Sequence, residues 1–415
     1  MPRLVRDRLT WVMYVQLALW VYFLYGFGPV APLLRDELHI SRTLAGLHGT
    51  AFAVGGIVGG LVLPALTRRL GRNRLIWAGL SCVCGAALGM YAAHHIALTL
   101  TFTTLASLGA AMAVNAINAA LTDHHGTAAP AAISEANAVA AAVGLVAPLV
   151  VGATYAAGWG WRLGLVIVVL PVALTAVYAR AKAVRPPEPA GFGQPHAGHR
   201  PLPGAFWLAL TSLFATGSVE ICLTLWGSDV LRDRVHVSAG VATAAVSALI
   251  AGMVLGRLAG GRLLLAFRPT RVLLGALAVT LAGFAVFWSV TVPWLAVAGL
   301  CVCGVGMGLH YPLGVGLALA HSDGQPDLAA ARASFAVGIA FGVAPFALGA
   351  LADRAGPHQA FLLVPLFVAV SALAIVRLDR SWHREPGRAG AALEAGPGPL
   401  SGGSDGPQVK RTRAT

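Results

Sequence analysis

Charged residues are scarce in this 415-residue chain. They make up 11% of it, against 57% hydrophobic residues, and the mean hydropathy is +0.75. A soluble globular protein has a charged share near a quarter, so this composition excludes an ordinary water-soluble enzyme. The hydrophobic residues come in runs of about 18 or more, the length that crosses roughly 30 Å of hydrocarbon as a helix. A polytopic membrane protein is therefore expected.

Other absences narrow the class further. Lysine occurs only at Lys182 and Lys410, and the phosphate-loop pattern G-x-x-x-x-G-K-[ST] is missing, so ATP use is not expected. Alternation of period two is absent, which argues against a transmembrane β-barrel. The five cysteines all fall inside hydrophobic runs, so no disulfide framework and no metal site follows. No cofactor is expected.

The hydrophobic runs predict an all-α membrane protein with twelve transmembrane helices. The first run is too long for a signal-peptide core and lacks a small-residue cleavage site, which predicts a retained helix. The predicted spans lie near 9–33, 44–66, 75–93, 97–121, 133–156, 162–180, 205–229, 240–264, 272–291, 294–319, 333–352 and 358–377.

The net charge of +13 reflects topology rather than nucleic-acid binding. With both termini placed in the cytoplasm, 23 of the 29 Lys and Arg residues fall on the cytoplasmic side, counting Arg257 with a cytoplasmic loop. This excess is the positive-inside rule. It predicts a multi-pass protein of the cytoplasmic membrane, and no basic stripe with interleaved aromatics indicates a nucleic-acid partner.

The chain contains an internal repeat at an offset of 197 residues. LLRDELHIS at 33–41 matches VLRDRVHVS at 230–238, and VAPLVVGA at 146–153 matches VAPFALGA at 343–350. The same register relates further polar and glycine positions, so a six-helix unit is written twice. Because each unit has an even number of helices, the halves should relate by a pseudo-two-fold axis along the membrane normal. The nine-residue motif itself is explained by helix ends, with Ser41 and Ser238 as caps.

The repeat divides the chain into an N-terminal bundle (1–184), a Pro- and Gly-rich cytoplasmic linker (185–204), a C-terminal bundle (205–384) and a tail (385–415). The composition of the linker forbids a regular helix. The composition of the tail predicts a disordered cytoplasmic segment.

Two six-helix repeats, a basic loop after the second span and a long central linker resemble the major facilitator superfamily of secondary transporters. The stretch PALTRRLGRNR at 64–74 is similar to the family signature G-x-x-x-D-R-x-G-R-R, with Arg69 and Arg72 among the matching positions. Pro64 and Arg68 replace its glycine and its acid. GLHYPLGVGLALA at 308–320 resembles the fucose/sugar-proton symporter branch. The resemblance implies two bundles that rock around a shared cavity.

Because the acid of the family's cytoplasmic charge lock is missing, a replacement is expected from Glu135 and Arg332, which begin the fifth and eleventh spans. Glu135 is predicted to pair with a base of the other half, Arg257 or Arg262. The alternative is a glutamate stabilised by its own helix N-terminus. The gating candidates are Glu135, Arg332, Arg257, Arg69 and Arg72.

Of the sixteen acidic residues, only Glu220 lies well inside a predicted span. An unpaired charge there costs several kcal/mol, so Glu220 should hold a partner or be protonated for part of a cycle. It is the candidate for proton coupling and substrate binding. The alternative is a protonated structural glutamate that bridges helices.

Other polar residues at comparable depth could contact a substrate. Asn115 and Asn118 share one helix face, while His310 and Tyr311 lie on a helix of the other half. Trp20 is the tryptophan furthest from either interface. Interhelical hydrogen bonds and core packing explain the same residues without a substrate.

These features predict a secondary active transporter, a monomer that moves a small solute by alternating access. Proton-coupled uptake of a sugar-like or other small polar compound is the first interpretation. Proton-driven efflux of amphiphilic compounds is the alternative. A membrane-embedded enzyme or a sensor is a remote alternative, because no catalytic or metal cluster falls within the spans.

Overall fold

The computed structural model describes residues 5–187 and 201–384, and these form helices with no strand. Most of the predicted linker and the predicted tail lie outside the described residues. Twelve helical segments are long and apolar enough to cross a membrane, which confirms the predicted number of spans. The all-α membrane fold predicted from the composition is therefore present.

The first half begins with a span that changes direction through a short 3-10 helix, and its sixth span is built from two helices. Its elements are α1 (Arg8–Phe27), η1 (Gly28–Val30), α2 (Ala31–Leu38), α3 (Arg42–Leu70), α4 (Arg72–Ala92), α5 (Ile96–His125), η2 (Gly126–Ala128), α6 (Ala129–Ala156), α7 (Trp161–Val166) and α8 (Val169–Ala181).

The second half follows the same order with a longer opening helix. Its elements are α9 (Gly204–Val235), α10 (Ala239–Ala266), α11 (Pro269–Ser289), α12 (Pro293–Ala320), α13 (Pro326–Ala355), α14 (Pro357–Ala360) and α15 (Leu363–Arg384).

The two copies of the nine-residue motif fold alike. The side chain of Ser41 accepts a hydrogen bond from the backbone of Leu44, and that of Ser238 accepts one from Val241, so both predicted caps are confirmed. The preceding helices both end at a histidine in the left-handed region, with φ 51° at His39 and 56° at His236. That conformation is uncommon outside glycine, so its presence in both copies supports the duplication.

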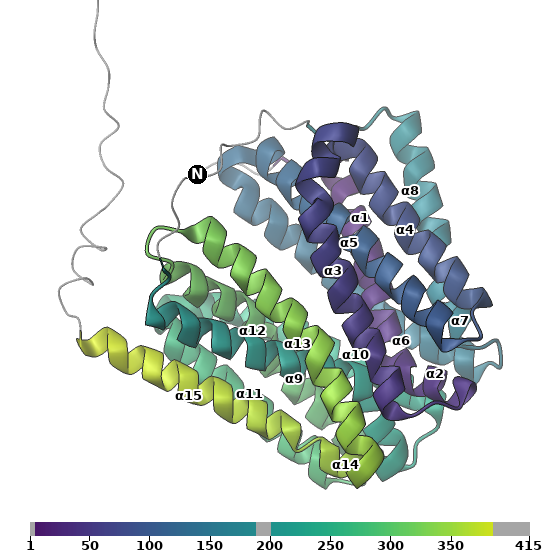
Figure 1. Ribbon diagram of the computed structural model, residues 1–415, viewed down its shortest axis with the longest axis vertical. Helices are drawn as coiled ribbons and strands as arrows, with labels where there is room; N and C mark the ends of the chain where they lie inside the picture. The colour runs from purple at the N-terminus through teal and green to yellow at the C-terminus, as the bar shows by residue number, and fades with distance from the viewer. Residues whose placement is uncertain (1–4, 188–200, 385–415) are drawn as a thin grey trace, which may run out of the picture.

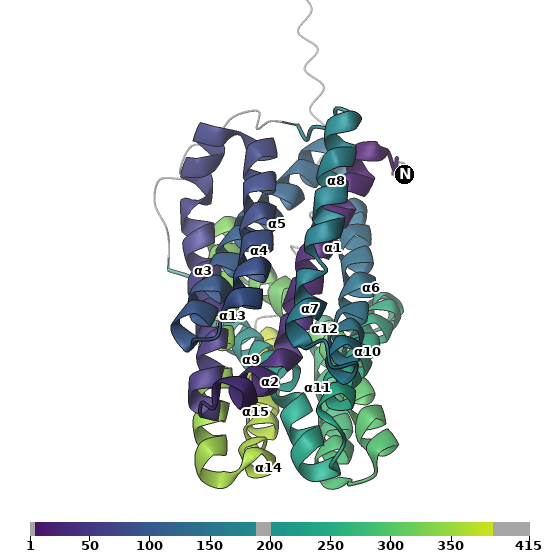
Figure 2. The same ribbon diagram turned by 90° about the vertical axis from the view of Figure 1, so that its right-hand side faces the viewer.

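The halves meet along two pairs of helices, α3 with α13 and α6 with α10 (Figure 2). Gly152 on α6 lies against Gly240 on α10, and Gly349 on α13 lies against the backbone of Arg42. Adding the repeat offset to Gly152 gives Gly349, so the two contacts are equivalent positions of the repeat. The pairs lie on opposite sides of the molecule, as a two-fold relation between the halves requires.

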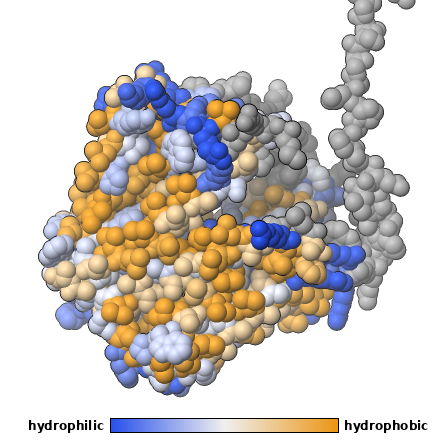
Figure 3. Space-filling view, turned by 180° about the vertical axis from the view of Figure 1, so that it is seen from behind, coloured by the Kyte–Doolittle hydropathy of each residue, from blue (hydrophilic) through white to orange (hydrophobic). Residues whose placement is uncertain are grey.

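The helices approach most closely at the end of the molecule that contains Ser41 and Ser238, which we call the closed end. The ribbons of the two halves diverge from there toward the end where the N-terminus lies (Figure 1). Large apolar side chains are exposed on both halves: Leu61, Leu170 and Leu258 are 75%, 65% and 72% exposed. Hydrophobic residues cover much of the middle of the face in Figure 3. Such a surface matches the lipid interior of a membrane.

Glycine is required where α3 crosses α13. A Cβ atom on Gly49 would lie 2.4 Å from Cγ of Pro345 and 2.6 Å from the carbonyl oxygen of Phe341. Gly60, on the same helix, has no atom within 4 Å of such a position. We expect Gly49→Ala to lower the free energy of unfolding by about 1–3 kcal/mol, as overpacking does. Gly60→Ala should instead raise it by up to about 1 kcal/mol.

The thermal unfolding midpoint of the purified protein in detergent checks this prediction. Both substitutions replace a glycine by alanine in the same helix, so helix propensity alone would shift both midpoints in the same direction. Equal midpoints for the two variants would contradict the close approach of α3 and α13.

Candidate functional site

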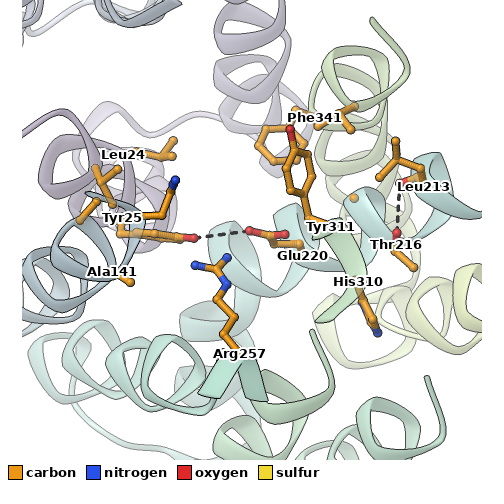
Figure 4. Close-up of a pocket in the computed structure, with 15 residues that line it drawn as sticks. Leu24, Tyr25, Ala141, Leu213, Thr216, Glu220, Arg257, His310, Tyr311 and Phe341 are labelled. Atoms are coloured by element: carbon orange, nitrogen blue, oxygen red, sulfur yellow. Dashed lines mark hydrogen bonds between the residues drawn. The ribbon is translucent and has the colours of Figure 1, made fainter. Parts of the chain in front are cut away.

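A cavity of about 220 Å³ lies between the halves near the middle of the spans (Figure 4). Most of its wall is apolar. The lining residues are Val21, Leu24, Tyr25, Asn137, Ala140, Ala141, Leu213, Thr216, Gly217, Glu220, Arg257, His310, Tyr311, Val337 and Phe341. They come from α1 and α6 of the first half and from α9, α10, α12 and α13 of the second.

Glu220 lies at the centre of this cavity, as the sequence predicts for a residue near the middle of α9. The Tyr25 hydroxyl, on α1, donates to its Oε1 at 3.5 Å. This is a long hydrogen bond, and it joins the first half to the second. Proton gain or loss on Glu220 therefore acts on a contact between the halves.

Arg257 faces the same carboxylate. Counted above with a cytoplasmic loop, it lies instead inside α10, which continues to Ala266, about 13 Å further along the axis. Its guanidinium is directed toward both Glu220 and the Tyr25 hydroxyl (Figure 4). Among the described residues it forms no direct ion pair with Glu220. A cation and an acid thus share one largely apolar cavity.

Tyr311 and His310 differ in orientation although they are neighbours on α12. Tyr311 is 49% exposed and projects into the cavity beside Glu220 (Figure 4). His310 is 1% exposed, and its Nε2 lies 3.2 Å from the Thr280 hydroxyl on α11. Both residues line the cavity, but Tyr311 projects into it, while His310 also contacts α11.

Three predicted cavity residues lie elsewhere. Trp20 is partly buried and packs against Phe23 and Phe52, beside the core of the first half. Asn115 donates to the carbonyl oxygen of Ala111 one turn earlier in its helix. Neither Asn115 nor Asn118, which share one face of α5, is among the lining residues. On the side of the first half, α1 and α6 line this cavity, and the contribution predicted for α5 stays a prediction.

The predicted ion pair of Glu135 with Arg257 or Arg262 is not formed between these described residues. Glu135 binds Arg6 of its own half through two bonds, of 2.9 and 2.5 Å, and accepts from Tyr14 at 3.3 Å. The reason is distance along the membrane: Arg257 lies at the cavity, while Glu135 lies at the end where the halves diverge.

The other gating candidates also contact their own half. Arg332 stacks over Trp207, 5.2 Å from its ring centroid. Arg72 binds the Asp123 carboxylate at 2.8 Å and the Pro187 carbonyl oxygen at 2.7 Å. It therefore ties α4 to α5 and to the start of the linker.

Arg69 is exposed on the last turn of α3. Like the other four candidates, it lies away from the closed end, where the contacts between halves described next are found.

Ion pairs between the halves lie at the closed end, where the sequence did not suggest them. Asp229, with a side chain 4% exposed, accepts from Arg35 at 2.9 and 3.0 Å and from Arg42 at 2.8 Å. Asp36 bridges Arg35 and Arg232. Arg35 and Arg232 are equivalent positions of the nine-residue motif. The motif therefore ends helices, as predicted, and also joins the halves.

A second contact at this end is a helix cap supplied by the other half. The Asp353 carboxylate, on α13, accepts from the backbone of Arg42 at 2.9 Å and of Thr43 at 2.8 Å, and from the Thr43 hydroxyl at 2.6 Å. A carboxylate is favoured at a helix N-terminus, where backbone N–H groups lack partners. The start of α3 is thus bound to the opposite half.

The sequence matches the family model of the Major Facilitator Superfamily over residues 13–263 and 208–402. The chain belongs to this superfamily. It is a multi-pass membrane protein of the superfamily, and the expected family resemblance is confirmed. In the described residues, no group of three or more His, Cys, Asp or Glu side chains is placed to hold a metal ion.

Three known proteins illustrate the similarity. The cyanate transport protein CynX of Escherichia coli (strain K12) is 32% identical over 164 residues, which is 36% of this chain and 42% of CynX. The chain thus spans less than half the length of this relative.

Solved structures of low identity share the fold. The structure of a bacterial homologue of the human lysosomal transporter Spinster, in an inward-facing and occupied conformation, superposes with a TM-score of 0.75 at 17% identity, covering 90% of this chain and 97% of that one. The superfamily transporter FucP in an outward conformation has a TM-score of 0.59 at 16% identity, covering 89% and 98%.

Proposed function

We propose that this transporter carries a small monovalent anion together with a proton, by alternating access through the cavity around Glu220. The observation that carries the proposal is that Glu220 and Arg257 line one largely apolar cavity, next to Tyr25 of the other half. When Glu220 is ionised, the two charges balance. When Glu220 is protonated, Arg257 needs another anion.

This balance links the two ligands. A proton on Glu220 removes the negative charge that competes for Arg257, so proton and anion each favour the binding of the other. The loaded cavity and the empty cavity have the same net charge. Transport of one proton with one monovalent anion is therefore expected to be electroneutral.

The size and chemistry of the cavity favour this substrate class over a sugar. The predicted sugar contacts Asn115, Asn118 and Trp20 are not among the lining residues, whereas the cation Arg257 lies beside Glu220 and suits an anion. A volume of about 220 Å³ is also below the 300–1,000 Å³ typical of sites for drug-sized ligands, which disfavours the efflux of large amphiphilic compounds. The relative named as a cyanate transport protein supports a small anion.

The orientation expected from the positive-inside rule completes the proposal. In this proposal the protein is a monomer in the cytoplasmic membrane, with both termini in the cytoplasm. Its two halves, residues 1–184 and 205–384, move relative to one another about the linker. The closed end then faces outward, and the structure corresponds to an inward-facing state.

Uptake into proteoliposomes tests the proposal directly. Radiolabelled cyanate, formate and acetate are compared with fucose and a nucleoside, under an imposed pH gradient or an imposed membrane potential. We expect accumulation of an anion with acid on the side of entry, and no accumulation driven by the potential alone. Efflux by proton exchange would require the opposite gradient, and accumulation of a neutral sugar would overturn the anion class.

Arg257 provides a separate prediction for the same assay. A hydrogen bond to a charged group is worth about 1.5–3 kcal/mol, so Arg257→Gln should raise the KM for the transported anion about 10- to 150-fold. Arg257→Lys keeps the charge and should restore part of the affinity. An unchanged KM in Arg257→Gln would remove this residue from the binding site.

A further inference from the structure

A second hollow, of about 1040 Å³, lies on the outer surface of the first half, between the start of α1 and the end of α8. It is separate from the cavity between the halves. Its lining residues are Arg6, Asp7, Arg8, Leu9, Trp11, Val12, Val15, Leu174, Thr175, Tyr178, Lys182, Ala183, Val184 and Arg185. We call it the α1–α8 groove.

Three cations of the groove are available for a ligand. Arg8, Lys182 and Arg185 are exposed, and none of their side chains has a hydrogen-bond or ion-pair partner among residues 5–187 and 201–384. Arg6 differs, because it binds Glu135.

Among the described residues that line the groove, Asp7 is the one acid, and it is bound by neighbouring residues. Burial disfavours its charge, but hydrogen bonds from Thr10 and His124 outweigh burial and hold the pKa of Asp7 below its ordinary value. Three free cations therefore exceed the single acid, and the groove attracts anions.

The rest of the groove is largely apolar. Leu174 is 60% exposed, Trp11 50% and Tyr178 45%, and Val12 forms part of the floor. In the described part of the chain, the Trp11 indole N–H and the Tyr178 hydroxyl have no hydrogen-bond partner. Trp and Tyr at such a depth lie at the level of lipid headgroups.

We propose that the α1–α8 groove binds the headgroup of an anionic phospholipid of the cytoplasmic leaflet. The phosphate contacts Arg8, Lys182 and Arg185, and an acyl chain lies along Leu174 and Trp11. Basic pockets between transmembrane helices on the cytoplasmic side bind anionic headgroups in this way. The choice of leaflet rests on the orientation proposed above. A soluble phosphate would use the cations but leave the apolar half of the groove uncovered.

Native mass spectrometry of the full chain in detergent tests this proposal without any transport assay, so its failure and that of the proposed function are distinguishable. Phosphatidylglycerol and phosphatidylcholine with identical acyl chains are added at equal concentration. We expect selective retention of phosphatidylglycerol. The triple variant Arg8→Gln, Lys182→Gln, Arg185→Gln should lose about 100-fold in its affinity, since each cation contributes roughly fivefold.

The matched control is Arg180→Gln, which removes an exposed cation from the same end of α8 outside the groove. It should retain phosphatidylglycerol as the original protein does, and the single variants at 8, 182 and 185 provide the answer if the triple variant fails to fold. Equal retention of both lipids, or equal loss in the control, would overturn the proposal. Displacement of the lipid by inorganic phosphate at low concentration would also overturn the proposal. So would phosphatidylglycerol binding that is seen only after residues 385–415 are removed.

Discussion

Replacing Glu220 by glutamine is expected to abolish accumulation of substrate driven by a pH gradient, while exchange of substrate across the membrane continues. Glutamine resembles the protonated acid, so the cavity can still bind an anion at Arg257 but cannot release a proton. For one proton per anion, a gradient of one pH unit supports up to about tenfold accumulation. In Glu220→Gln the ratio should fall to one. Counterflow and net uptake in proteoliposomes measure the two activities separately.

Asp233→Asn is the matched control, because Asp233 is an exposed acid on the same helix. It should accumulate substrate as the original protein does. Net accumulation retained in Glu220→Gln would place the proton site elsewhere. Tyr25→Phe adds a finer comparison, since it removes only the 3.5 Å hydrogen bond to Glu220 and should weaken coupling without abolishing it.

Replacing Asp229 by asparagine is expected to open the closed end. The substitution leaves Arg35 and Arg42 without the carboxylate that binds both of them. Removing one partner of a buried ion pair costs about 3–5 kcal/mol, and the partly exposed arginines place this case at the lower end of that range. Because the pairs join the halves, the loss falls only on the conformation in which this end is closed. The equilibrium should therefore shift about 100-fold toward the other conformation.

A buried reporter measures this shift. Ser228 is 1% exposed and donates to the Pro29 carbonyl oxygen of the other half at 3.3 Å. In a Ser228→Cys background, a membrane-impermeant thiol reagent should react at least about tenfold faster after Asp229→Asn. Asp233→Asn again provides the control and should leave the rate unchanged. Equal labelling rates in all three proteins would show that the cluster does not hold this end closed.

Most of the fold followed from local patterns. Hydrophobic runs predicted the spans because only a helix satisfies its own backbone in lipid. Ser41 and Ser238 were recognisable as caps from their positions just before apolar runs. The offset of 197 residues predicted two equivalent halves, and the paired glycine contacts of Gly152 and Gly349 are consistent with it.

The candidate site was predicted less completely. Glu220 could be identified alone, because an acid in the middle of a span is costly. The sequence signal for Tyr25 was weak, because a tyrosine inside a span belongs to the core as often as it lines a cavity. Arg257 was counted with a cytoplasmic loop although it lies inside α10. The end of this helix is basic, so the sequence around a loop arginine and around a cavity arginine looks the same. The packing of Trp20 against Phe23 and Phe52 could not be predicted either, because an aromatic residue suits both a cavity and a core.

The sequence by itself determined the number of spans, the duplication and the single acid in mid-membrane, because these depend on composition and order along one helix at a time. The tertiary structure decided which side chains share a cavity and which ions join the halves. Those pairings, Glu220 with Tyr25 and Asp229 with Arg35, connect residues about 195 positions apart. Their distance is set by the packing of two bundles, which no local pattern specifies.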